Sequence, residues 1–147
     1  DANNNMMNSL IEACIKFSIT LNIACPKIYQ PNKALISLIK KQKGKIKIFN
    51  KKEIAIKNSD VVMTDKIISL NDKVNKKKKL KSFKNFKVDT KTMNLAKKDA
   101  IFLHCLPRGN EVTEEVFLGK QSRVWQQALN RVYVQKSILL YCFGKLR

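Results

Sequence analysis

The sequence predicts an α/β protein, a three-layer α/β/α arrangement in which helices cover both faces of a parallel sheet. Short apolar segments suited to buried strands alternate along the chain with amphipathic segments of helical period. That alternation indicates βαβ units, whose strands run parallel. The 147 residues suffice for one ordinary core and are few for two. Because no internal repeat or low-complexity linker divides the sequence, we predict a single domain over 1–147.

The first third of the chain predicts two helices and two strands. Apolar residues spaced three and four apart indicate an amphipathic helix over 8–21, and a short apolar strand follows over 22–25. A second helix is expected over 33–41, after a proline and an asparagine. Alternating lysine and isoleucine predicts a strand over 45–49, near a sheet edge that its charges protect from further pairing.

The middle of the chain predicts a short helix over 51–58, a buried strand over 60–64 and then a lysine-rich helix. We expect the lysines of this helix to be solvated and its apolar side to consist of Val74, Leu80 and Phe83.

The last third predicts short elements and then one long helix. The expected elements are a short strand over 86–88, a helix over 90–97, an apolar strand over 100–103, a helical turn over 114–118 and a long helix over 127–143. Gly144 is expected to end that helix.

The charge of the chain first suggests a polyanionic partner. Thirty Lys and Arg against 11 Asp and Glu give a net charge of +19. However, 26 of these cations are Lys, and the lysine runs lack interleaved aromatic residues for base stacking. We therefore expect no specific nucleic-acid partner, although a nucleic-acid-binding module over 73–87 stays open as an alternative.

Metal, disulfide and membrane functions find little support in the sequence. Four cysteines without C-x-x-C spacing and a single histidine provide too few ligands at usable spacing for zinc. The longest apolar runs fall well short of the roughly 20 residues that span a bilayer. No charged segment followed by an apolar one opens the chain, so we expect a reducing, cytoplasmic location.

Polar residues that follow the predicted strands are the candidate site, because ligands bind at the carboxyl ends of parallel strands. His104 and Cys105 could be packed core residues, or could face a ligand carbonyl and a ligand amine. Asp65 and Ser69 could be turn residues, or could accept hydrogen bonds from an ammonium group.

Two further polar residues lie at helix positions. Asn5 could only cap the first helix, or could donate to a carboxylate held at the positive end of that helix. Arg131 could be a surface residue, or could stabilise charge developing on a carbonyl oxygen.

In order along the chain, these residues lie in motifs that resemble the ornithine-binding half of ornithine carbamoyltransferases. The motifs are D-A-x-N-N-M-x-N-S-L at 1–10, T-D-x-x-x-S at 64–69, H-C-L-P at 104–107, E-V-F at 115–117 and N-R at 130–131. H-C-L-P is the most specific of them, since the sibling aspartate carbamoyltransferases carry proline where Cys105 stands.

The resemblance implies a Rossmann-like fold whose first strand lies before Asp1, a homotrimer of the full-length enzyme, and carbamoyl transfer from carbamoyl phosphate to ornithine without cofactor. It implies that the α-carboxylate and α-amino groups of ornithine are bound by Asn5, Asp65, Ser69 and the backbone of Leu70. It further implies that Cys105 and the backbone of Leu106 contact the side-chain amine. His104 and Arg131 would polarise the carbonyl of carbamoyl phosphate.

The sequence also departs from the family pattern. Asn71 stands where the family usually has glycine, and Leu129 stands where it has glutamate. The family's phosphate-binding motifs, S-x-R-T-R and H-P-x-Q, do not occur in these 147 residues. We therefore expect half of a two-domain enzyme, inactive alone. The alternatives are transfer to another amine, such as putrescine or an acylated ornithine, and a non-catalytic interaction module.

Overall fold

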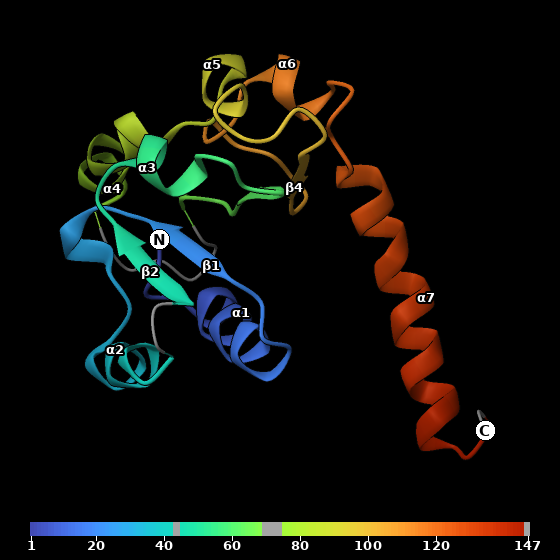
Figure 1. Cartoon of the computed structure of the whole chain (residues 1–147). Helices are drawn as coiled ribbons and strands as arrows, with labels where there is room; N and C mark the ends of the chain where they lie inside the picture. The colour runs from blue at the N-terminus through green and yellow to red at the C-terminus, as the bar shows by residue number, and fades with distance from the viewer. Residues whose placement is uncertain (43–44, 69–74, 146–147) are drawn as a thin grey trace.

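The computed structural model describes residues 1–42, 45–68 and 75–145, and it confirms the predicted α/β class (Figure 1). Short strands alternate with helices, and a long helix closes the described chain. The elements are α1 (Asn5–Lys16), β1 (Leu21–Ala24), α2 (Lys33–Lys40), β2 (Ile46–Phe49), α3 (Lys52–Ile56), β3 (Val61–Thr64), α4 (Lys76–Phe83), α5 (Thr90–Met93), β4 (Ile101–His104), α6 (Glu114–Phe117) and α7 (Val124–Cys142).

The strands form two parallel pairs. β1 pairs with β2, with Leu21 opposite Ile46, and β3 pairs with β4, with Val61 opposite Ile101. The parallel direction is as predicted, but within the described residues no pairing joins β1 to β3. The outer edge of β4 is partly covered by a parallel bridge between Phe102 and Ser122.

Each of the two strand pairs packs within its own cluster of buried apolar residues. The β1–β2 half is packed around buried residues from α1, β1, α2 and β2, with Ile11 fully buried. The β3–β4 half contains Phe102, which is also fully buried and belongs to one cluster with buried side chains from α3, α5, α6 and the start of α7. The sequence favoured one core, whereas the described residues form two adjacent ones.

The first helix begins earlier than predicted because of its cap. The side chain of Asn4 accepts a hydrogen bond from the backbone N–H of Met7 at 2.8 Å, which satisfies one free donor of the first turn. The helix ends at Lys16, and Ser18 takes a left-handed conformation with φ of 55°. Phe17, an apolar residue of the helix predicted over 8–21, is 74% exposed as a result.

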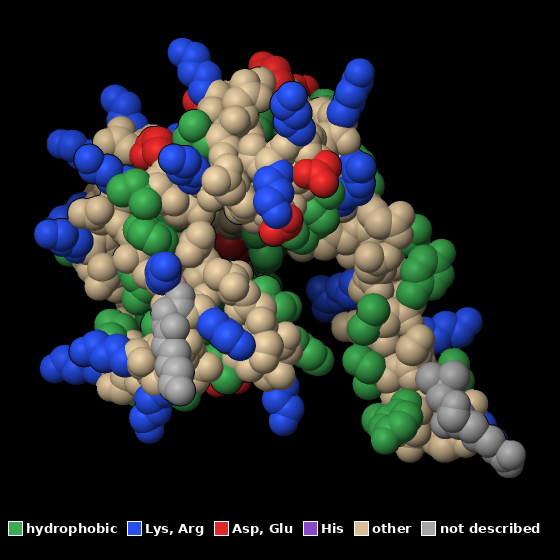
Figure 2. All heavy atoms as spheres, in the orientation of Figure 1, with side chains coloured by type: hydrophobic (Ala, Val, Ile, Leu, Met, Phe, Trp, Pro, Cys, Tyr) green, Lys and Arg blue, Asp and Glu red, His purple; other side chains and the backbone are tan. Residues whose placement is uncertain are grey.

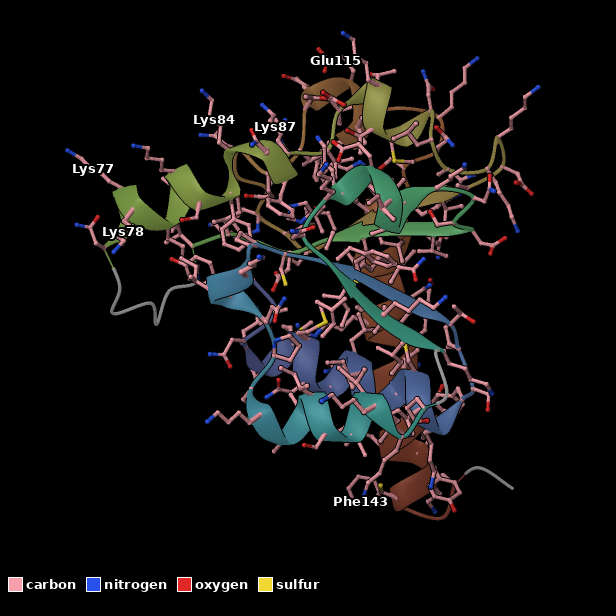
Figure 3. The ribbon with its side chains drawn as sticks, turned by 60° about the vertical axis from the view of Figure 1, so that its left-hand side comes forward. Lys77, Lys78, Lys84, Lys87, Glu115 and Phe143 are labelled. Atoms are coloured by element: carbon pink, nitrogen blue, oxygen red, sulfur yellow. The ribbon has the colours of Figure 1, made fainter. Side chains whose placement is uncertain are left out.

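The lysine-rich helix α4 buries a lysine where a leucine was expected. Leu80 is 42% exposed, whereas Lys79 is 2% exposed and its Nζ lies 2.6 Å from the Asp1 carboxylate. Lys79 also lies over the ring of Tyr29. Phe83 is buried as predicted, and Val74 lies outside the described residues. Other α4 lysines, such as Lys77 and Lys78, point outward (Figure 3).

Two predictions in the last third are too long. The strand expected over 86–88 is a 3₁₀ turn, Lys84–Phe86, followed by one isolated bridge between Val88 and Val112. The helix expected over 90–97 is only the single turn α5. Packing against neighbouring elements, which a sequence pattern does not report, sets these boundaries.

The long helix α7 projects away from the rest of the molecule (Figure 1). Its first residue, Val124, is fully buried, and Gly144 with φ of 65° follows its end as predicted. Many large apolar side chains along it are exposed, namely Trp125, Leu129, Val132, Tyr133, Val134, Ile138, Leu139 and Tyr141. Within the described ranges, no helix combines the length and apolarity needed to cross a bilayer.

Candidate functional site

The carboxyl ends of β3 and β4 bring two predicted site residues into contact. Thr64 and His104 are opposite each other in the register, so Asp65 and Cys105 both leave the sheet at the same edge. The Cys105 thiol donates a hydrogen bond to the Asp65 carboxylate at 3.2 Å. Both residues are half-buried. A contact between residues 40 apart in the chain therefore supports the strand-end location of the site.

The surroundings of Cys105 keep its thiol protonated. Burial raises the pKa of the Cys105 thiol, and the hydrogen bond to Asp65 and the negative charges of Asp65 and Glu111 raise it further. A hydrogen bond from the backbone of Lys66 opposes these effects but does not cancel them. Since the thiolate is the nucleophilic form of cysteine, Cys105 is suited to hydrogen bonding and not to covalent catalysis.

His104 lies beneath this surface. Its side chain has no exposed area, and its ring packs edge-on against Phe102 and Phe117, with ring centroids 6.3 and 6.0 Å away. Its Nε2 lies 2.8 Å from Oε1 of Glu111. An ionised carboxylate only accepts hydrogen bonds, so we assign the proton to Nε2. The buried Nδ1 has no hydrogen-bond partner among the described residues.

Glu111 is the residue that the sequence analysis missed. It is 5% exposed, and besides His104 it accepts a hydrogen bond from the backbone N–H of Gly109 at 2.5 Å. Burial raises the pKa of the Glu111 carboxyl, but the hydrogen bonds from His104 and Gly109 outweigh it, so the net pKa is lowered. An acid seven residues after a histidine that ends an apolar strand was the available signal, because such a histidine needs an acceptor.

Helix α7 is tied to the site through Gln127. Its side-chain oxygen accepts a hydrogen bond from the backbone N–H of His104 at 3.0 Å. Arg131 lies one turn further along α7, on the face that Gln127 shares, and is exposed. Leu129, at the departure from the family pattern, is 46% exposed.

Of the remaining predicted residues, Asn5 and Leu106 lie in the part of the chain that the structure describes. Asn5 is the exposed first residue of α1, and the cap of that helix is Asn4. Leu106 follows Cys105, is 44% exposed, and precedes a cis peptide bond to Pro107. Ser69 and Leu70, like Asn71, lie outside the described residues.

Asp65 also opens onto an apolar cavity of about 550 Å³ between the two strand pairs. The lining includes Asn4 and Thr64 as well as residues of β1 and β3. In the part of the chain that the structure describes, no three acidic, histidine or cysteine side chains are grouped so as to hold a metal ion.

A carboxylate and a neutral thiol in contact at the carboxyl edge of parallel strands define an α/β domain suited to binding a small polar ligand. The comparison with known families makes this specific. Residues 1–142 match the family model described as "Aspartate/ornithine carbamoyltransferase, Asp/Orn binding domain", and the chain belongs to that family.

Curated relatives and solved structures agree with this assignment. Ornithine carbamoyltransferases of Nitratiruptor sp. and Methanococcus maripaludis are 42% and 44% identical, over 94% and 95% of this chain but 47% and 49% of their own length. The crystal structure of the anabolic ornithine carbamoyltransferase from Campylobacter jejuni gives a TM-score of 0.86 at 38% identity, over 97% of this chain and 49% of that one. The enzyme from Pyrococcus furiosus gives 0.85 at 32% identity, over 100% and 49%. The chain thus spans about half the length of the relatives that it matches.

Proposed function

We propose that this chain is the ornithine-binding domain of an ornithine carbamoyltransferase. The observation that carries the proposal is the contact between Asp65 and Cys105 within the family match. The Asp65 carboxylate is an acceptor suited to the α-ammonium group of ornithine, and the Cys105 sulfur lies beside it to contact the side-chain amine. Ser69, the Leu70 backbone and Asn5 complete the proposed amino-acid site, and the Leu106 backbone joins Cys105.

In the proposed reaction, the neutral δ-amine of ornithine attacks the carbonyl carbon of carbamoyl phosphate. A C–N bond forms, the nitrogen loses a proton, and the C–O bond to phosphate breaks, which gives citrulline and phosphate. Arg131 and His104 are proposed to stabilise the charge on the carbonyl oxygen, and no metal or organic cofactor is required. Positioning and oxyanion stabilisation supply the rate enhancement.

The pairing of His104 with Glu111 supports a fixed imidazole in this mechanism. Because the Glu111 carboxylate accepts from Nε2–H, the ring is oriented, and the proposed donation to the carbonyl oxygen requires a second proton on Nδ1. Gln127 connects the backbone of His104 to the helix that carries Arg131, so this hydrogen bond links the elements of the two proposed carbonyl-polarising groups.

The surroundings of the site support its operation within a larger assembly. The relatives are about twice as long as this chain, and the apolar surface of α7 is the kind that other polypeptide covers. We propose that the carbamoyl-phosphate half lies in further polypeptide, that the complete enzyme is a homotrimer, and that it acts in the cytoplasm in arginine biosynthesis.

A chimera tests the proposed reaction directly. The amino-terminal half of the Campylobacter jejuni relative would be joined to Asp1, and citrulline would be measured with L-ornithine and carbamoyl phosphate. We expect activity that Cys105→Ala or Arg131→Ala greatly reduces, while Cys142→Ala, at an exposed cysteine far along α7, leaves it unchanged. Residues 1–147 alone should form no citrulline.

The same chimera separates the alternatives. Turnover of putrescine in preference to ornithine would indicate a transferase for another amine, because a diamine has no α-amino or α-carboxylate group for Asp65 and Ser69. A folded chimera without turnover of either amine would favour a non-catalytic interaction module. Nucleic-acid binding that persists at physiological ionic strength with a steep salt dependence would favour a role for the lysines of 73–87.

A further inference from the structure

One side chain holds both ends of a loop that belongs to the proposed site. The loop runs from His104, the last residue of β4, to Gly109. The Glu111 carboxylate lies 2.8 Å from His104 Nε2 and accepts a hydrogen bond from the Gly109 N–H at 2.5 Å. Both contacts are made by the same oxygen, Oε1, so this carboxylate joins the two ends of the loop across its base.

Glu111 and its partner are themselves held by other elements. Glu111 is 5% exposed, and its backbone carbonyl accepts a hydrogen bond from the N–H of the buried Val88 at 2.9 Å. The backbone N–H of His104 donates to Gln127 at 3.0 Å. Because both sides of the contact between carboxylate and imidazole are anchored, the Glu111 side chain cannot swing aside and keep that contact.

Position 109 has room only for glycine while the carboxylate is in place. A Cβ atom at residue 109 would lie 2.6 Å from Glu111 Oε2 and 3.0 Å from Oε1. Such a separation is well inside the optimum for non-bonded atoms, so an alanine would push the carboxylate away from its two donors. Gly109 does not have a positive φ, so close approach and not backbone conformation requires the glycine here.

The loop carries both residues proposed to contact the side-chain amine of ornithine, Cys105 and Leu106. The Cys105 thiol donates to Asp65 at 3.2 Å, across from the end of another strand. Asp65 lines the cavity that appears in Figure 2 as a hollow between the two halves of the molecule. Leu106 is 44% exposed, so packing does little to hold it. The hydrogen bonds at the base of the loop are therefore suited to fix its distance from Asp65.

We propose that Glu111 and Gly109 are positioning residues that set the length of the amino-acid side chain accepted by the site. The inference rests on the proposed function, in which Asp65 accepts from the α-ammonium group and Cys105 and Leu106 contact the terminal amine. A fixed loop makes the distance between these two contacts fit one chain length. Lysine is longer than ornithine by one methylene group, a difference that a fixed site can discriminate by about 10–200-fold. A loop that is no longer held can move outward and admit the longer amine.

The first measurement uses residues 1–147 in a Cys142→Ser background and follows alkylation of Cys105 by iodoacetamide at pH 8. Gly109→Ala keeps every charge of the site but displaces the Glu111 carboxylate. The Cys105 thiol should then lose its contact with Asp65 and react about threefold faster or more.

Asn110→Ala is the matched control for this measurement. Asn110 is the next residue along the chain, is exposed, and makes no side-chain hydrogen bond among the described residues. Its alkylation rate should equal that of the parent, and circular dichroism checks that both variants are folded. Cys14 and Cys25 are buried and contribute little to the reaction.

The second measurement uses the chimera described above and compares kcat/KM for L-ornithine with kcat/KM for L-lysine. A loss of folded enzyme lowers both values equally and leaves their ratio unchanged, whereas a loosened loop lowers the ratio. We expect Gly109→Ala and Glu111→Ala to reduce the ratio of ornithine to lysine about tenfold or more. Glu111→Gln, which keeps an acceptor oxygen, should retain most of the ratio, and Asn110→Ala should leave it unchanged.

Equal alkylation rates for Gly109→Ala and Asn110→Ala would overturn the proposal, and so would an unchanged ratio of the two kcat/KM values in Gly109→Ala. A chimera with the native residues that turned over neither amine would instead count against the proposed function. In that case the alkylation rates of residues 1–147 would still decide whether the Glu111 carboxylate holds the loop.

Discussion

Replacing Glu111 tests whether the buried carboxylate holds the site together. Glu111→Ala leaves the buried His104 Nε2–H and the part-buried Gly109 N–H without their acceptor. A hydrogen bond to a charged group contributes about 1.5–3 kcal/mol. Two such bonds give about 3–6 kcal/mol, and relief of the buried charge offsets part of this. We expect a loss of about 3 kcal/mol in unfolding free energy, within the range for breaking a buried ion pair.

Urea unfolding of residues 1–147 measures this loss. Trp125, the single tryptophan, packs edge-on against Phe117, and the Phe117 ring also packs on His104. The fluorescence of Trp125 therefore reports on the surroundings of His104 and Glu111. Glu111→Gln keeps one acceptor oxygen and should cost about half as much. Glu114→Gln is the matched control, because the Glu114 side chain is 68% exposed and lies 3.7 Å from Arg108. This variant should change the unfolding free energy by less than about 0.5 kcal/mol. A Glu111→Ala loss no larger than that of Glu114→Gln would refute the reasoning.

Three further predictions concern charge and protonation. The pKa of the Glu111 carboxyl is lowered below its ordinary 4.5 in the folded chain, so just below pH 4.5 the folded state binds fewer protons than the unfolded state. The unfolding free energy should therefore fall as the pH drops below about 4.5. In acid titrations, Glu111→Gln should make this decrease smaller. In a Cys142→Ser background, iodoacetamide should react slowly with Cys105 at pH 8, and the further change Asp65→Asn should speed this reaction several-fold. Equal reaction rates with and without Asp65→Asn would show that Asp65 does not hold the thiol protonated. Lys79→Met should lower the unfolding free energy, measured with urea, by about 1–3 kcal/mol, because the Asp1 carboxylate loses a buried partner. Lys78→Met at the surface should change it very little. Similar losses for both variants would contradict the burial of Lys79.

The alternation of apolar segments was sufficient to predict the α/β class and the parallel direction of the strands. The residues that end β3 and β4 were found the same way, since ligand sites in such sheets follow strand ends. The H-C-L-P motif then connected His104 and Cys105 to a family that the comparisons confirm.

What the sequence did not reveal depends on contacts between distant segments. A periodic pattern favours Leu80 over Lys79 as the buried residue, but it cannot foresee that Asp1 and Tyr29 lie where the lysine can reach them. Glu111 looked like any loop acid until the fold placed it against His104. The division into two strand pairs likewise depends on which strands are adjacent, and local periodicity carries no information on adjacency.

The projection of α7 gives it the properties of a lever whose pivot lies at the site. At 1.5 Å per residue, its 19 residues extend about 28 Å from the buried Val124. A tilt of about 10° about that pivot would carry the far end about 5 Å but Arg131 only about 2 Å. Gln127 lies nearer still to the pivot and holds the backbone of His104. The carboxyl end of the helix would therefore move much farther in such a tilt than the residues at its base, which stay next to β4.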